Sequence, residues 1–267
     1  MAESFKSALR ENKAKMTLKS PQFNTIIVLL FIIIKSYGNL LPLTLVSDTY
    51  LNNHLLKTIV NLFFSIIFIL MILKSHFKEN VGLTKGSFFR FDLLVIPLFY
   101  GVLINLLFFE FEGVLEIKYI ISLLAYTISV GLIEELSLRG LIQNYLIDYF
   151  GHHKKGVIKA IVSMSLLFAI LHLLRFDKGL WGEMAQLFYA LFIGIGFGTV
   201  FYLTKRIYPL IIIHSLIDFS AGIDRIGITA NQHSPDSFIN SMLIILLLSP
   251  YFIYALYLFK QLKTQTS

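Results

Sequence analysis

The sequence predicts an all-α, polytopic membrane protein with about eight transmembrane helices. Of its 267 residues, 56% are hydrophobic and only 15% are charged, and the mean hydropathy is +0.74. A soluble domain of ordinary composition carries about 25% charged residues. The apolar residues also gather in runs that approach the roughly 20 residues needed to cross a bilayer. These observations favour an integral membrane protein over the soluble classes.

Eight apolar runs supply the spans of a single transmembrane domain, residues 23–259, between a basic tail (1–22) and a short tail (260–267). The fourth run is the longest and the seventh is short, which predicts a tilted helix and a helix with an irregular start. The expected spans are Phe23–Val46, Leu55–Leu73, Phe91–Phe109, Ile117 to near Ile147, Val157–Leu174, Met184–Thr204, Ile207–Ile223 and Phe238–Phe259.

The net charge of +7 resides in the loops, so we predict no nucleic-acid partner. If the N-terminus is cytoplasmic, 16 of the 23 Lys and Arg residues lie on the inner side and five on the outer side. This bias predicts that both termini are cytoplasmic. The chain has no cysteine, which excludes disulfides and Cys-ligated metals.

Two glutamates and an arginine interrupt the fourth predicted span. Ionisable groups at membrane depth are costly and mark functional sites or ion pairs. Glu135 and Arg139 are four residues apart, so they share a helix face and can pair. Glu134 is turned about 100° from Glu135. We therefore expect Glu135 to be structural and Glu134 to be free for chemistry.

Three further polar residues lie within later predicted spans. His172 is near the end of the fifth span, and His214 and Asp218 share one face of the seventh. From a rise of 1.5 Å per residue, these three residues and Glu134 lie about 12–22 Å from the inner ends of their helices. The sequence therefore predicts one site, formed by spans four to seven.

Hydrolysis is the chemistry that suits this set of residues. A glutamate can act as a general base toward water, an imidazole can orient the same water, and further polar groups can stabilise an oxyanion. Glu134, His172 and His214 are also a ligand set for a catalytic zinc with an open fourth position. The residues leave zinc and a metal-free mechanism open.

Small residues in the sixth span suggest how that helix packs. Gly194 and Gly198 have the spacing of closely packed transmembrane helices. The alternative interpretation is a substrate groove.

The order and spacing of the polar motifs resemble those of the CAAX protease and bacteriocin-processing (CPBP or Abi-type) intramembrane protease family. The motifs are Glu134-Glu135-x-x-x-Arg139, Phe168-x-x-x-His172 and His214-x-x-x-Asp218, and the similarity covers about residues 117–220. The resemblance implies an intramembrane endopeptidase with an all-helical core.

The same resemblance implies roles for the individual residues. Glu134 and His172 would activate water, and His214 and Asp218 would complete the site or hold the oxyanion. Glu135, Arg139 and Phe168 would support it. The position equivalent to Asp218 is often Asn in the family. An Asn amide can donate a hydrogen bond to an oxyanion, whereas an ionised Asp cannot. Family members have been described both as metalloproteases and as metal-independent glutamate proteases.

The expected partners are a hydrophobic peptide or protein substrate and membrane lipid. Family members cleave prenylated C-terminal tails in eukaryotes, and in bacteria they are linked to peptide maturation and bacteriocin immunity. Short loops favour a protein of the bacterial plasma membrane. Two alternatives are a non-catalytic immunity or regulatory protein on the same scaffold, and a transporter or proton pathway. A transporter would show repeat symmetry, which the sequence lacks.

The predicted topology is tested with reporter fusions. A reporter fused after Lys155 is expected to lie in the cytoplasm, and one fused near Gln232 is expected to lie outside, because of the distribution of Lys and Arg. A reporter at either terminus that reads outside would overturn the arrangement.

Overall fold

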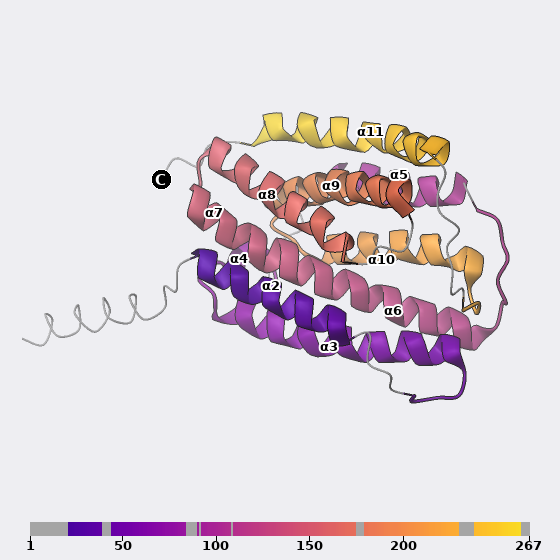
Figure 1. Ribbon diagram of the computed structural model, residues 1–267. Coiled ribbons are helices and arrows are strands. Elements are labelled where there is room, and N and C mark those ends of the chain that lie inside the picture. The colour runs from indigo at the N-terminus through magenta and orange to yellow at the C-terminus, as the bar shows by residue number, and fades with distance from the viewer. Residues whose placement is uncertain are drawn as a thin grey trace, which may run out of the picture.

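All regular elements that the structure describes are helices, which form one bundle (Figure 1). The computed structural model describes residues 21–38, 44–83, 90, 92–107, 109–174, 179–229 and 238–262. The elements are α2 (Pro21–Gly38), α3 (Thr49–Lys74), α4 (Lys78–Val81), α5 (Asp92–Leu107), α6 (Ile117–Glu135), η1 (Leu136–Gln143), α7 (Asn144–Phe150), α8 (Lys154–His172), α9 (Gly179–Thr204), α10 (Tyr208–Gly222), η2 (Ile223–Arg225) and α11 (Phe238–Gln261). The predicted all-α class is confirmed.

The apolar helices occupy the eight predicted spans. Five are long and apolar enough to cross a membrane, namely α3, the continuous rod of α6, η1 and α7, then α8, α9 and α11. The helices α2, α5 and α10 are apolar but shorter. At 15 residues, α10 is about 22 Å long, less than the roughly 30 Å of a hydrocarbon core.

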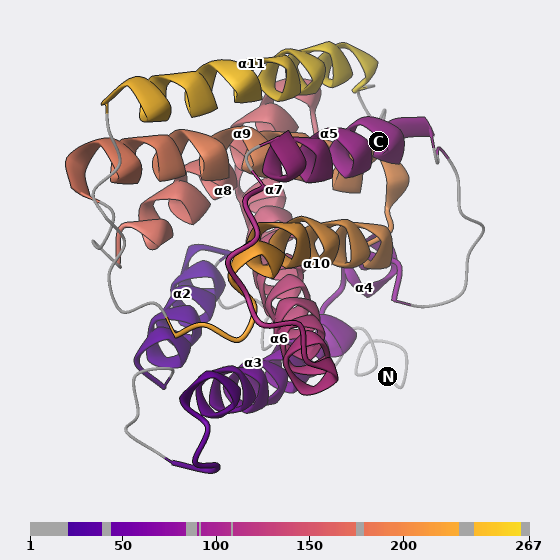
Figure 2. The same ribbon diagram turned by 90° about the vertical axis from the view of Figure 1, so that its right-hand side faces the viewer.

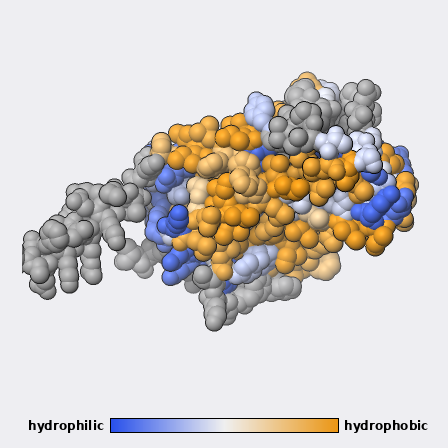
Figure 3. All heavy atoms as spheres, turned by 90° about the horizontal axis from the view of Figure 1, so that it is seen from below, coloured by the Kyte–Doolittle hydropathy of each residue, from blue (hydrophilic) through white to orange (hydrophobic). Residues whose placement is uncertain are grey.

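The outer surface of the bundle is apolar. Figure 3 shows a broad hydrophobic band with hydrophilic residues toward both ends. Large side chains such as Phe63, Ile66 and Leu246 are 58–66% exposed. Soluble monomers rarely expose contiguous apolar patches larger than a few hundred Å². The band is the surface that lipid covers, and the protein is an integral membrane protein.

Helix boundaries differ from the sequence prediction at the start of the chain. The predicted first span continues to Val46, but α2 ends at Gly38, and residues 44–48 are not helical. Helix α3 begins at Thr49, earlier than the predicted Leu55, because the Asp48 carboxylate caps it by accepting a hydrogen bond from Leu51 N at 3.0 Å. Hydropathy identifies an apolar run but not its cap.

Some of the predictions fall on parts of the chain that the structure does not describe. The basic tail up to residue 20, positions 39–43 of the first predicted span, Phe91, Gln232 and residues 263–267 lie outside the described residues.

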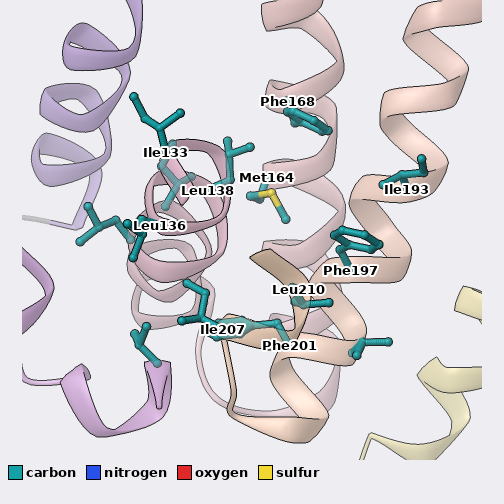
Figure 4. Close-up of a cluster of buried hydrophobic side chains, with 14 of the residues drawn as sticks. Ile133, Leu136, Leu138, Met164, Phe168, Ile193, Phe197, Phe201, Ile207 and Leu210 are labelled. Atoms are coloured by element: carbon teal, nitrogen blue, oxygen red, sulfur yellow. The ribbon is translucent and has the colours of Figure 1, made fainter. Parts of the chain in front are cut away.

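The predicted long fourth span is one rod of 34 residues, Ile117–Phe150, in the centre of the bundle (Figure 2). Its middle segment, η1, is a π-helix whose eight residues are all buried. Figure 4 shows Leu136 and Leu138 of this region grouped with Phe168 of α8, Phe197 of α9 and Leu210 of α10. The motif that carries the charged residues is therefore also the centre of the apolar core.

The glycines of α9 serve helix packing. A Cβ atom on Gly194 would lie 2.9 Å from Ser165 Cβ, and one on Gly198 would lie 2.8 Å from Gln143 Oε1. Only glycine permits α8 and η1 to approach α9 this closely. The packing interpretation of these residues is confirmed.

Candidate active site

The π-helical segment shapes the site from within the central rod. A π-helix bonds residues five apart and leaves backbone carbonyls to be satisfied by other donors. The Asn144 side-chain amide donates to the carbonyl oxygens of Arg139 and Gly140, both at 3.1 Å. The sequence predicted a regular helix here, and the polar Asn144, five residues after Arg139, is the signal that could have indicated the irregularity.

The Glu135 carboxylate joins two other side chains of the site. Its Oε1 atom accepts a hydrogen bond from Arg139 Nη1 at 2.8 Å and another from His214 Nδ1 at 2.7 Å. The side chains of Glu135 and Arg139 are fully buried. The i,i+4 ion pair expected from the sequence is present, but the bond to His214 on α10 was not predicted.

This bond orients the His214 ring. A carboxylate oxygen only accepts, so Nδ1 carries a proton and Nε2 is directed to other partners. His214 Nε2 lies 3.5 Å from Glu134 Oε2 and 3.6 Å from Asp218 Oδ2. One imidazole thus stands between the buried carboxylate and two carboxylates that face a cavity.

Aromatic rings enclose the Arg139 guanidinium. Its Cζ atom lies 5.2 Å from the ring centre of Phe168 and 5.4 Å from that of Phe197, distances that suit cation–π contacts. Phe197 also meets His214 edge to face, with ring centres 6.0 Å apart. Phe168 packs beside the site as the resemblance implied, whereas nothing in the sequence distinguished Phe197 from other apolar residues.

His172 reaches the site from the last turn of α8. Its Nδ1 lies 2.9 Å from the carbonyl oxygen of Phe168, which can only accept, so this nitrogen carries the ring proton. The ring packs edge to face on Phe168, with ring centres 4.6 Å apart. Because Nδ1 carries the proton and bonds to the backbone, the other ring nitrogen of His172, Nε2, is available as an acceptor.

The four candidate catalytic residues line one cavity of about 200 Å³, together with Phe168. The cavity is large enough for several water molecules at about 30 Å³ each. The side chains of Glu134 and Asp218 are 25% and 33% exposed, so both carboxylates reach it. Sequence reasoning did not identify two further lining residues of α9, Gln186 and Tyr189.

Close packing against α6 and a side-chain amide from α5 fix the position of α10. A Cβ atom on Gly131 would lie 2.5 Å from Ser215 Oγ and 2.8 Å from the carbonyl oxygen of Ile211. From α5, the Asn105 amide donates to the carbonyl oxygen of Ile217 at 2.8 Å and to Ser220 Oγ at 2.9 Å. Both contacts hold the helix that carries His214 and Asp218.

The described residues include no group of three or more His, Cys, Asp or Glu side chains arranged to hold a metal ion. His214 Nδ1 is engaged by Glu135, and the His172 Nδ1 atom is engaged by the backbone. Each ring keeps Nε2 for the cavity, and Nε2 is the nitrogen that a zinc-ligating histidine uses while its Nδ1–H is held, so these positions of His172 and His214 leave zinc and a metal-free mechanism open.

One family model matches the part of the chain that contains the site. Residues 116–220 match the family described as type II CAAX prenyl endopeptidase Rce1-like. This part of the chain resembles that family. No curated protein and no solved structure matches the chain.

The Rce1-like segment runs from the start of α6 to α10 and contains every candidate site residue. Its limits agree closely with the segment expected from the motifs, so the resemblance to the CAAX protease family is confirmed. The helices α2, α3, α5 and α11 lie outside the match.

Substitution of the two adjacent glutamates should separate their contributions to folding. Glu135→Gln removes the counter-charge of a fully buried arginine, and breaking such a pair costs about 3–5 kcal/mol. Glu134→Gln alters a side chain that reaches the cavity and should leave folding intact. Thermal unfolding of the two purified variants in one detergent measures the difference, and equal midpoints would contradict the assignment.

Proposed function

We propose that the protein is an intramembrane endopeptidase that hydrolyses a peptide bond in a hydrophobic or membrane-associated peptide. The single observation that carries the proposal is the placement of His214 Nε2 within 3.6 Å of both Glu134 and Asp218, at a cavity inside an apolar bundle. The Rce1-like match of residues 116–220 supports the same reaction class.

Glu134 is the general base in this proposal. Its carboxylate takes a proton from a water molecule as the water oxygen bonds to the carbonyl carbon of the substrate. When the carbon–nitrogen bond breaks, Glu134 returns that proton to the leaving amine. His172 lines the same cavity, and with Nδ1–H bonded to the backbone its Nε2 can accept from the water and orient it.

His214 stabilises the tetrahedral intermediate. Because Glu135 holds Nδ1–H, the doubly protonated ring donates from Nε2 to the oxyanion. Asp218 supports the protonated ring from 3.6 Å when ionised, and donates its own hydrogen bond when protonated. The buried Glu135–Arg139 pair fixes the ring during these steps.

The substrate and setting follow from the same proposal. The cavity lies within an apolar bundle, a setting that suits a peptide that partitions into lipid. We propose a role in peptide maturation or bacteriocin immunity in a bacterial plasma membrane, with both termini cytoplasmic.

A second candidate is a non-catalytic immunity or regulatory protein on the same scaffold. The acid at position 218, where the family often has Asn, favours this reading. It differs from the peptidase in one measurable respect, since binding to a target would survive loss of Glu134.

The proposed reaction is tested by proteomics of peptides released from membranes that contain the wild type or Glu134→Gln. The substitution keeps the shape of the side chain and removes the base, so peptides released by the wild type should be absent with the variant. An equal amount of folded protein in the two membranes is the control. Full release by Glu134→Gln would overturn the proposed role of this residue.

The role of Asp218 and the dependence on metal are tested together. In the reaction described above, Asp218→Asn supplies a neutral donor at the same position and should retain or increase turnover, and activity should persist in metal-free protein after a strong chelator. A zinc mechanism gives a different result. Loss of a ligand's hydrogen-bond partner lowers affinity or activity about 10–100-fold, and stoichiometric zinc would restore chelated enzyme.

A further inference from the structure

A second cavity lies directly beside the candidate active site. It has a volume of about 320 Å³ and is open on one side, between α3, α6, α10 and η2. Tyr50, His54 and Arg225 lie among its lining residues at the end of the bundle where α3 begins and α10 ends. Val130 and Asp218 form part of its wall deeper along α6 and α10.

The two cavities share part of their walls. Val130 and Asp218 line both the second cavity and the cavity that contains Glu134, His172 and His214. The Asp218 side chain is 33% exposed. Asp218 therefore stands at the junction of a catalytic cavity and a more open one.

The lining of the second cavity includes polar side chains, whereas the neighbouring helix surface is apolar. Tyr126 and Thr127 of α6 join Tyr50, His54, Asp218 and Arg225 in its wall. On the same helix, Leu124 and Ile128 point outward and are 43% and 42% exposed, as lipid-facing residues are. Water enters a cavity that is roomy and offers polar partners.

Backbone hydrogen bonds hold residues 112–114 beside the segment that contains Arg225, a lining residue of this cavity. Glu112 N donates to the carbonyl oxygen of Asp224 at 2.8 Å, and Val114 N donates to that of Ile226 at 2.7 Å. An ion pair of Arg225 Nε with Glu112 Oε2, 3.5 Å apart, lies at the rim of the cavity. Both of these side chains are about half exposed, so charged groups stand where water would enter.

We propose that the second cavity is the route by which water reaches Asp218 and the active site from this end of the bundle. The inference rests on the proposed hydrolysis, which consumes one water molecule for each bond cleaved at a site surrounded by apolar helices. In this arrangement the peptide enters the catalytic cavity from the lipid. Water arrives separately, past Tyr126 and Thr127.

The absence of cysteine from the chain permits a direct test. Single-cysteine variants are treated in membranes with a charged, membrane-impermeant thiol reagent. Val130→Cys should react from the same side of the membrane as Glu112→Cys, which reports the rim. Ile128→Cys is the matched control, because it lies two residues away on α6 but faces lipid, and it should remain unmodified.

A plug in the route separates it from access through the catalytic cavity. Ala221 is exposed and lines the second cavity, so Ala221→Trp in the Val130→Cys chain should slow labelling about tenfold or more. Leu216→Trp places the same side chain on the lipid-facing surface of α10 and should leave the rate unchanged. Peptide release by a cysteine-free Ala221→Trp protein should fall in parallel, while Leu216→Trp should match the wild type.

Labelling does not depend on catalysis, so the route and the proposed function can fail separately. An unreactive Val130→Cys, or one whose labelling is unchanged by Ala221→Trp, overturns the route. Blocked labelling with undiminished peptide release overturns its role in supplying water. If the wild type releases no peptide, the proposed function fails, and the labelling rates still decide whether the route exists.

Discussion

The arrangement of this site depends on one buried carboxylate that serves two partners. Glu135 Oε1 binds the Arg139 guanidinium within the central rod and the His214 ring on α10. Burying charges is costly, and the attraction between them repays that cost only when the geometry is good and hydrogen bonds satisfy the remaining groups. Among the described residues, Glu135 Oε2 and the Nε and Nη2 atoms of Arg139 have no hydrogen-bond partner. Here the guanidinium also lies between the rings of Phe168 and Phe197. The ion pair is thus the link through which the core determines where His214 stands.

The two adjacent glutamates divide the work because they differ in surroundings. Glu135 is fully enclosed, while Glu134, one residue earlier, reaches the cavity. The π-helical turn that follows them is satisfied by Asn144 and packed on all sides. Such irregular turns occur frequently at functional sites. A rigid, buried turn next to a solvent-accessible carboxylate is suited to chemistry that needs fixed geometry and water in an apolar bundle.

The sequence predicted the features that depend on local spacing and composition. Hydropathy located the helices, the i,i+4 rule identified the Glu135–Arg139 pair, and the order of the motifs indicated the family. Features that depend on contacts between distant segments were missed. The bond from His214 to Glu135, the contact of Phe197 with Arg139 and the second cavity at Asp218 all join residues of different helices. The catalytic roles of Glu134, His172, His214 and Asp218 remain predictions.

The central claim is that the buried pair positions His214 as well as stabilising the fold, and the double variant Glu135→Leu/Arg139→Met tests it most directly. Replacing a buried ion pair by apolar residues of similar size is often neutral for stability, whereas removing one partner is costly. Thermal unfolding and peptide release are measured for the wild type, both single variants and the double variant. The double variant should recover stability but not peptide release, because His214 has lost the acceptor at Nδ1. A double variant that releases peptides at the wild-type rate would contradict it.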